Sequence, residues 1–370
     1  QPGGLYYGVN TQTKHIILAD RKTLKCPNGI VLGTPGSGKS FFAKREMANA
    51  FFATNDHILI LDPENEYTAL TEQLHGQTIY LAPDSHSYLN PMDLDLSTDV
   101  GESPMLMQAD FLLSQCELMM ASYGNPLMPI EKSLIDRCIS LVYRDYLKNP
   151  RPENMPVLGD LYQCLREQHN SRADDLATAM EIYVTGSLSY LNHRTNVDLN
   201  NRMVCYNTSK LGQGLKKLVM SNVQKHIWQR TAVNRYAGIT TRIFLDEFHL
   251  LLKEPQTAAY TAEIYKRFRK WNGIPTSLTQ NVKDLLDSSE IENILENSDF
   301  VLMLNQGASD RNILAQRLGI SPQELSHVTN SSEGEGLLFF GDKIIPFEDK
   351  FPRDTQLYRV MTTKPSDLAA

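Results

Sequence analysis

Eight consecutive residues near the start of the chain have the types and spacing of a phosphate-binding loop. They are Gly33, Thr34, Pro35, Gly36, Ser37, Gly38, Lys39 and Ser40, which follow the pattern G-x-x-x-x-G-K-S. In such a loop, backbone N–H groups point inward around the phosphates of a nucleotide, and glycines stand where a Cβ would block that approach. Lys39 would place a positive charge on the β- and γ-phosphates, and the Ser40 hydroxyl is placed to ligate Mg2+.

The residues on both sides of this loop have the arrangement that the motif requires. Ile30-Val31-Leu32 is a short apolar strand, and residues 41–52 form a good helix. This strand–loop–helix context favours a ligand-binding loop over a glycine-rich turn without a ligand. The start of the helix adds its positive end to the site, so we expect the residues from Gly33 to Phe41 to bind ATP together with Mg2+.

A second group of acids follows an apolar strand much later in the chain. Ile243-Phe244-Leu245 ends in Asp246 and Glu247. In nucleotide hydrolases an acid at this place holds Mg2+ through water, and the next carboxylate can orient or deprotonate the attacking water. Two solvated acids at a strand end are the alternative, which the earlier phosphate-binding loop disfavours. We therefore assign Asp246 to the metal and Glu247 to catalysis.

Two more polar groups are expected at the ends of core strands. His57 to Leu61 is an almost wholly apolar run, and it is followed by Asp62-Pro63-Glu64-Asn65-Glu66-Tyr67. Glu64 could position the water or the metal, or it could belong to a turn or a helix cap, and we leave both open. Gln280 follows the strand Thr276 to Thr279, where it could hydrogen-bond the γ-phosphate or the water.

Hydrolysis also requires positive charge on the transferring phosphoryl group, which a neighbouring subunit can supply as an arginine. Arg269 lies in the basic segment Lys266-Arg267-Phe268-Arg269-Lys270, and Arg311 follows a strand at residues 300–304. For each arginine the alternative is a solvated helix face. His249 is close to Asp246 and Glu247, but we expect it to be a packing residue, since the histidines show no metal-ligand spacing.

The composition excludes several other classes of protein. The chain has 370 residues, 41% of them apolar, and a formal net charge of −7, which argues mildly against a protein that mainly coats DNA. Its five cysteines include no C-x-x-C pair, so neither a disulfide framework nor a zinc site is indicated. No apolar run reaches the length of a membrane span and no signal peptide is present. The chain begins at Gln1 without Met, and we expect an N-terminal part to be missing.

The pattern of elements predicts an α/β fold with an all-α insertion. Strands and helices alternate over residues 1–95 and 199–370, whereas residues 96–198 contain no convincing strand and read as helices punctuated by prolines. We predict helices over residues 105–122, 130–147, 157–168 and 173–185, and a hairpin over residues 336–347 with a turn at Gly341 and Asp342. The expected architecture is a mainly parallel sheet flanked by helices, interrupted by the helical segment.

Several segments together resemble a known family of motors. The phosphate-binding loop, the acid pair, the Gln280 strand and the insertion resemble the RecA-like P-loop motors of the HerA–FtsK superfamily. The resemblance is closest to the ATPase domain of the VirB-four family of type IV secretion and conjugation systems, and it runs over nearly all of the chain. Its particular segments are residues 62–67, residues 244–249 (Phe244-Leu245-Asp246-Glu247-Phe248-His249), Tyr206-Asn207-Thr208-Ser209-Lys210-Leu211 and Thr279-Gln280-Asn281.

The resemblance implies an ATPase at the cytoplasmic face of the bacterial inner membrane that energises pilus assembly and substrate export. Its implied partners are further copies of itself, acting as a hexamer but also met as monomers or dimers, and core components of the secretion channel. The family's arginine near the end of the helix before the Gln strand carries over onto Arg269. Two alternatives remain: a DNA-translocating coupling protein or helicase-like motor of the same superfamily, and a nucleotide-gated scaffold with negligible turnover.

Overall fold

The computed structural model describes residues 3–96, 103–120, 127–280, 289–329, 331–364 and 367. Two compact units are distinguished. Unit 1 comprises Gln1–Thr78, Asn200–Asn207 and Asn234–Ala370, and unit 2 comprises Ile79–Leu199 and Thr208–Val233. Within the described residues no helix combines the length and the apolar character that crossing a membrane requires.

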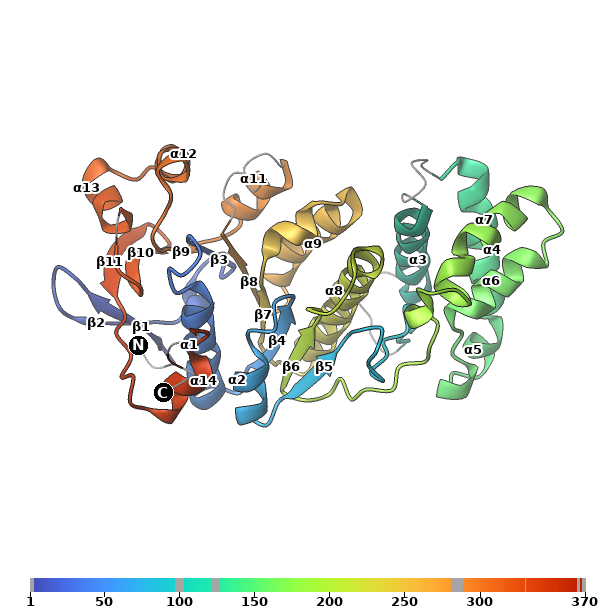
Figure 1. The fold of residues 1–370 in the computed structure, drawn as a ribbon, viewed down its shortest axis with the longest axis horizontal. Helices are drawn as coiled ribbons and strands as arrows, with labels where there is room; N and C mark the ends of the chain where they lie inside the picture. The colour runs from blue at the N-terminus through green and yellow to red at the C-terminus, as the bar shows by residue number, and fades with distance from the viewer. Residues whose placement is uncertain are drawn as a thin grey trace. The chain divides into compact units, whose positions relative to one another are not determined.

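Unit 1 is organised by a sheet with a parallel centre (Figure 1). Its strands are β1 (Leu5–Asn10), β2 (Ile16–Ala19), β3 (Gly29–Leu32), β4 (His57–Asp62), β5 (Gln77–Tyr80), β6 (Met203–Asn207), β7 (Thr241–Leu245), β8 (Gly273–Thr279), β9 (Phe300–Met303), β10 (Glu335–Phe340) and β11 (Lys343–Glu348). They lie in the order β2-β1-β11-β10-β9-β3-β8-β7-β4-β6-β5. The neighbours from β9 to β6 run parallel, whereas β2, β1, β11 and β10 extend the sheet as antiparallel strands.

The predicted strands are confirmed, including the hairpin of β10 and β11, in which Phe340 pairs with Lys343 around the predicted turn. Every residue of β3, β7 and β8 is buried. Burial along the whole length of a strand suits parallel strands that are covered on both faces. The fold class predicted from the sequence is therefore the observed one.

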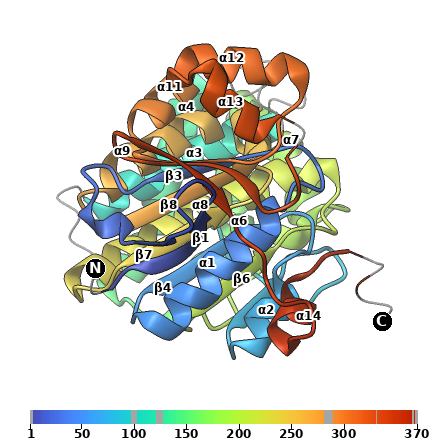
Figure 2. The same ribbon diagram turned by 90° about the vertical axis from the view of Figure 1, so that its left-hand side faces the viewer.

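Helices cover the parallel strands of unit 1 on both sides. They are α1 (Lys39–Ala53), α2 (Thr68–Gln73), α9 (Pro255–Phe268), α11 (Ser289–Glu296), α12 (Ala308–Leu318), α13 (Pro322–Leu325) and α14 (Gln356–Met361). Figure 2 shows α1, α2 and α14 on one side of these strands and α9 and α11 on the other. Helices α2, α11, α13 and α14 were not predicted; α2, α13 and α14 are too short to show a clear helical period.

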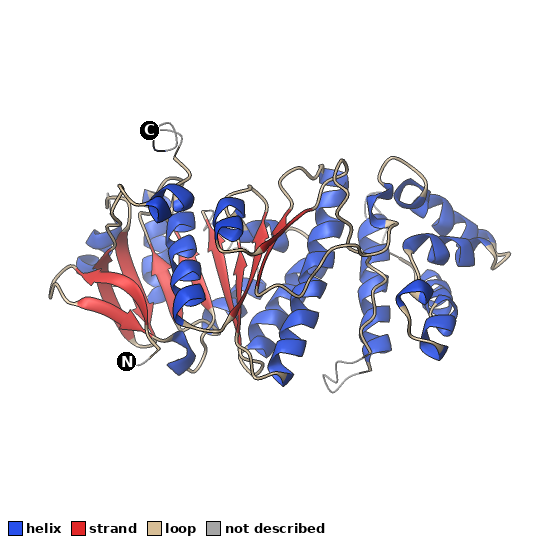
Figure 3. Cartoon of the chain, turned by 90° about the horizontal axis from the view of Figure 1, so that it is seen from below, coloured by secondary structure: helices blue, strands red, loops and turns tan. Residues whose placement is uncertain are grey.

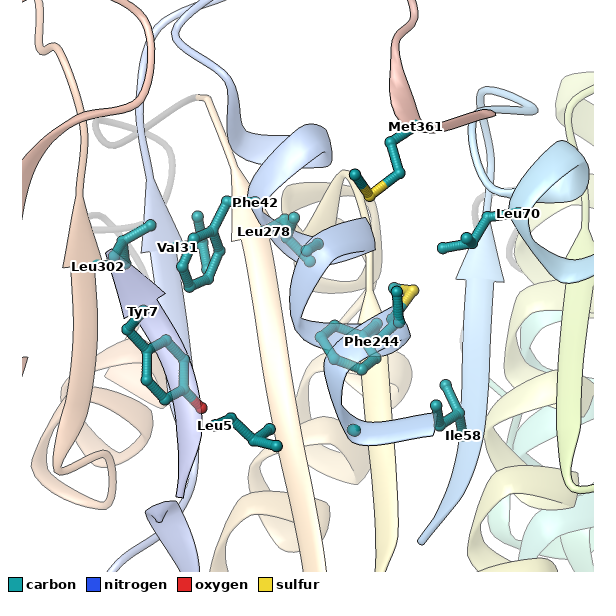
Figure 4. Packing of buried hydrophobic residues seen from close by; sticks show 14 of the residues in the cluster. Leu5, Tyr7, Val31, Phe42, Ile58, Leu70, Phe244, Leu278, Leu302 and Met361 are labelled. Atoms are coloured by element: carbon teal, nitrogen blue, oxygen red, sulfur yellow. The ribbon is translucent and has the colours of Figure 1, made fainter. Parts of the chain in front are cut away.

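The hydrophobic core of unit 1 joins α1 to the sheet. Figure 4 shows Phe42 of α1 near Val31 of β3, and Phe244 of β7 and Ile58 of β4 in the same buried cluster. Met361 of α14 belongs to this cluster as well. Because α1 begins at the phosphate-binding loop, this packing holds the loop against the ends of the strands.

A buried network of charges also anchors α1. Oε1 of Glu46 accepts hydrogen bonds from Nη1 of Arg21 at 3.0 Å, Nη1 of Arg242 at 3.0 Å and the hydroxyl of Tyr7 at 3.1 Å. Nε of Arg242 in turn donates to Asp56 at 2.9 Å. The side chains of Glu46 and Arg21 are fully buried and that of Arg242 is 2% exposed. A single carboxylate thus connects the middle of α1 to β1, β7 and the segment before β3.

Unit 2 is mainly helical (Figure 3). It contains α3 (Pro104–Met120), α4 (Pro129–Val142), α5 (Arg144–Lys148), α6 (Leu158–Arg166), α7 (Ser171–Val184) and most of α8 (Gln213–Tyr236). The helix predicted over residues 130–147 is two helices, since α4 ends at Val142 and α5 begins at Arg144, with Tyr143 between them. The hydroxyl of Tyr143 is buried, donates to the carbonyl of Met92 and accepts from Nε2 of Gln108, so the break places a polar group inside the unit.

Candidate active site

The phosphate-binding loop follows β3 at the carboxyl edge of the sheet, where its glycines meet strict conformational demands. Gly36 has φ +73° and Gly38 has φ +100°, backbone angles that residues other than glycine rarely adopt. A Cβ on Gly33 would lie 2.4 Å from Oγ of Ser37. Gly38 is the N-cap of α1, so the helix directs its positive end into the loop. These features fit a cradle for phosphate groups.

The polar side chains of the loop are also placed for an anion. Nζ of Lys39 donates to the carbonyls of Gly33 at 2.8 Å and Thr34 at 3.2 Å, so the ammonium group lies across the loop. Burial lowers the pKa of Lys39, although Glu247 and Asp246 oppose this shift. Oγ of Ser37 is buried and has no hydrogen-bond partner among the described residues, which leaves it available to a phosphate oxygen.

The remaining loop residues lie at its rim. The backbone N–H of Thr34 donates to the carbonyl of Asn305 at 2.9 Å, which ties the loop to the segment after β9. Pro35 is exposed and Ser40 is half-buried in the first turn of α1. The ring of Phe41 packs on Phe351 and Tyr358, with centroids 5.9 Å and 5.5 Å apart.

Asp246 and Glu247 follow β7, two strands away from β3. The N–H of Asp246 donates to the carbonyl of Leu61 at 3.2 Å, which brings the acid to the end of β4 as well. Burial raises the pKa of Asp246 to about 8, and the neighbouring carboxylates of Glu66 and Glu247 add to the shift. A buried carboxylate in an acidic environment is stabilised by a cation, and Mg2+ with bound nucleotide would provide one.

Few protein side chains are available to hold Mg2+ at this site. Across the described residues no group of three or more His, Cys, Asp or Glu side chains could hold a metal ion by itself. Mg2+ at nucleotide sites is commonly held by one or two protein groups, phosphate oxygens and water, so Asp246 and Ser40 are side chains that could hold it together with a nucleotide.

Glu247 has one hydrogen-bonded carboxylate oxygen and one that lies close to a histidine. Its Oε1 accepts a hydrogen bond from Nε2 of Gln280 at 2.8 Å, and its Oε2 lies 3.1 Å from Nδ1 of His249. Burial alone would raise the pKa of Glu247, but His249 and then Lys39 outweigh it and hold this pKa below its usual value. The structure therefore brings Gln280 to Glu247; Asn281, the next residue of the predicted motif, lies outside the described residues.

The turn after β4 presents Glu66 to the loop. The carboxylate of Asp62 accepts from the N–H groups of Glu66 and Tyr67, both at 2.9 Å, and Asn65 has a positive φ of 59°. Glu66 then interacts electrostatically with Lys39 and Asp246. One oxygen of Glu66 is buried without a partner among the described residues. Glu64 is exposed and Glu66 is half-buried, so Glu66, which the sequence motif contains but does not single out, is a second candidate for positioning the water or the metal.

Replacing Glu66 and Glu64 with glutamine, one at a time, tests whether Glu66 contributes to catalysis. We expect Glu66→Gln to lower the turnover of ATP roughly tenfold, which corresponds to about 1.4 kcal/mol of transition-state stabilisation. The same change should raise the melting temperature of the nucleotide-free protein, because Glu66 opposes Asp246. Glu64→Gln is the matched control and should change neither quantity. Equal effects of the two variants on turnover and melting would contradict the assignment.

The two predicted arginines lie outside the loop. Arg269 is exposed at the end of α9, where its Nη1 is 3.4 Å from Sγ of Cys26. Arg311 is half-buried in the first turn of α12, which begins after Gly307. In the part of the chain that the structure describes, neither guanidinium donates a hydrogen bond to residues 33–41. Arg269 and Arg311 are therefore candidates for contacting the phosphates bound by a neighbouring subunit.

Comparisons with known proteins agree with this architecture. The chain resembles the structure of VirB4 of Thermoanaerobacter pseudethanolicus, with 23% identity, a TM-score of 0.83, and coverage of 99% of this chain and 98% of that one. It also resembles the plasmid coupling protein TrwB in complex with ADP and Mg2+, with 14% identity, a TM-score of 0.59, and coverage of 89% and 87%. At these identities the similarity is one of fold. No curated protein matches the chain.

The sequence itself carries a family assignment. A model of the TraG P-loop domain matches residues 17–333, a range that begins before β3 and includes the phosphate-binding loop, the acids after β7 and Gln280. The predicted relationship to the RecA-like motors of conjugation systems is thereby confirmed, and the chain belongs to the TraG P-loop domain family.

Proposed function

We propose that the chain is an ATPase that hydrolyses MgATP to ADP and phosphate and powers a type IV secretion or conjugation machine. The observation that carries this proposal is the position of Glu247: its carboxylate is oriented by Gln280 and lies in the field of Lys39. A protein that only binds nucleotide has no chemical need for such a carboxylate. The structure of TrwB with ADP and Mg2+ supports the same ligands here.

Each residue of the site has a task in this reaction. The backbone of residues 33–41 and the ammonium group of Lys39 would hold the phosphates, and Mg2+ bound with the nucleotide would offset charge that develops on them. Asp246 and Ser40 would hold the metal, directly or through water. Glu247 would orient the attacking water and accept its proton, with Gln280 fixing the carboxylate and Glu66 accepting a hydrogen bond from ordered water.

The proposal extends to assembly and location. Among the described residues neither Arg269 nor Arg311 donates a hydrogen bond to residues 33–41, so we propose that Arg269, or alternatively Arg311, acts on the site of a neighbouring subunit in a hexamer. The work would be pilus assembly and substrate translocation at the cytoplasmic face of the inner membrane, through contacts with the secretion channel. The division into a core of residues 1–95 and 199–370 with an all-α insertion of residues 96–198 remains a prediction.

One alternative has support from a particular observation. The fold is similar to that of a plasmid coupling protein, so a motor that translocates DNA is the second candidate. The net charge of −7 disfavours a DNA-lined pore without deciding the question. The third candidate, a nucleotide-gated scaffold, would bind nucleotide without hydrolysing it.

The deciding experiment measures ATP turnover against protein concentration, with and without single-stranded and duplex DNA. We expect turnover per subunit to rise with concentration, because the arginine comes from a neighbour, and to be unaffected by DNA. Lys39→Ala should remove turnover and nucleotide binding together, whereas Lys343→Ala, at the exposed hairpin, should behave as wild type. Strong stimulation by DNA would favour the translocating motor. Absence of turnover at every concentration would reject the ATPase.

A further inference from the structure

A histidine lies against the proposed catalytic carboxylate and has no role in the scheme above. His249 is the second residue of the short helix η5 (Phe248–Leu252), which starts immediately after Glu247. Nδ1 of His249 lies 3.1 Å from Oε2 of Glu247, and the two side chains are only 18% and 14% exposed. The contact is therefore largely removed from water.

Nδ1 of His249 and Oε2 of Glu247 are close enough that each could satisfy the other as a hydrogen-bond partner. Among the described residues neither Nδ1 of His249 nor Oε2 of Glu247 makes a hydrogen bond, although the two atoms lie 3.1 Å apart. Buried polar atoms are rarely left unpaired. An Nδ1–H donated to Oε2 would satisfy both atoms at once, and Oε1 is already occupied by Gln280. This arrangement defines which ring nitrogen carries the proton.

The backbone gives this contact a purpose beyond packing. Glu247 has a φ of 44° and a ψ of 47°, a left-handed conformation that residues other than glycine seldom adopt. The extended conformation of β7 ends at Leu245, so contacts of the side chain, rather than the strand, set the direction of the Glu247 carboxylate. His249 comes from the helix that follows and Gln280 from the end of the neighbouring strand β8, so the carboxylate is held from two sides.

We propose that His249 is a positioning residue of the ATPase site: its Nδ1–H donates to Glu247 and, with Gln280, aims the carboxylate at the attacking water. This inference rests on the proposed function. If His249 only filled space, another side chain of similar volume could replace it without loss of activity. A positioning histidine requires a hydrogen-bond donor at Nδ1, and this difference can be measured.

The first test compares steady-state kinetics of His249→Ala, His249→Asn, His249→Gln and the packing control Leu250→Ala, a half-buried residue of the same short helix. We expect His249→Ala to lower kcat roughly 10- to 100-fold with KM for ATP nearly unchanged, because misorientation affects the chemical step. His249→Asn should recover much of the loss, since its amide nitrogen takes the place of Nδ1, whereas the amide of His249→Gln corresponds to Nε2 and should recover less. Wild-type kcat in His249→Ala, or no recovery with Asn, would overturn the proposal.

The second test does not require turnover. Histidine-selective 15N NMR of the full chain, with His249 assigned from the His249→Gln spectrum, reports which ring nitrogen is protonated. We expect Nδ1 to carry the proton in the neutral ring and to lose it to Nε2 in Glu247→Ala. An Nε2–H ring in the wild type would overturn the contact. Absence of ATP hydrolysis in the wild type would instead reject the proposed function, so the two failures are distinguishable.

Discussion

Glu247→Gln is expected to lower ATP turnover by about 10³, within the range that a positioned general base contributes. The amide has nearly the shape of the carboxylate, but it cannot accept the proton of the attacking water or carry its charge. Nucleotide binding should survive, because residues 33–41, and not Glu247, are proposed to hold the phosphates. The measurement is steady-state turnover alongside the thermal shift that MgATP produces.

A matched change separates this effect from the loss of one negative charge. Asp342 is exposed in the turn between β10 and β11, so Asp342→Asn removes a carboxylate without touching the site. Its turnover should equal that of the wild type. Turnover within a few-fold of wild type in Glu247→Gln would mean that another group activates the water. Loss of the MgATP thermal shift would mean that Glu247 serves binding more than catalysis.

Of the proposed substitutions, Glu46→Ala should lower the free energy of unfolding the most. The change leaves the guanidinium groups of Arg21 and Arg242 facing one another without the carboxylate that both contact at 3.0 Å. Removing one partner from a buried ionic group typically costs about 3–5 kcal/mol, because the remaining charges stay desolvated. Asp56 still contacts Arg242 and moderates the loss. The midpoint of chemical denaturation measures the effect.

An exposed ion pair serves as the comparison for this prediction. Glu292 and Arg317 have side chains that are 55% and 49% exposed, so Glu292→Ala should change the free energy of unfolding by less than about 1 kcal/mol. Glu46→Ala should also weaken MgATP binding, since the network holds α1 and thereby the loop. Equal denaturation midpoints in the two variants would show that the buried network contributes little to stability.

Much of the site can be predicted from the sequence because its determinants are local. Lys39 and Ser40 are defined by their spacing from glycines that a tight loop requires, and the acids after β7 are defined by the apolar run before them. The parallel sheet follows in the same way from continuous apolar strands alternating with helices. The neighbourhood of Gln280 and Glu247 could also be expected, because the carboxyl ends of parallel strands meet at one edge.

Other features depend on tertiary structure, since they are set by single backbone angles and by distant partners. Spacing cannot show which of Glu64 and Glu66 is the more buried; the turn, with its positive φ at Asn65 and two N–H groups bound by Asp62, leaves Glu66 half-buried and Glu64 exposed. The left-handed conformation of Glu247 likewise brings His249 onto its carboxylate, where the sequence suggests only packing. The Glu46 network joins residues far apart in the chain. The sequence alone thus determined the loop, the acid pair and the family, whereas folding decided how each carboxylate is oriented and held.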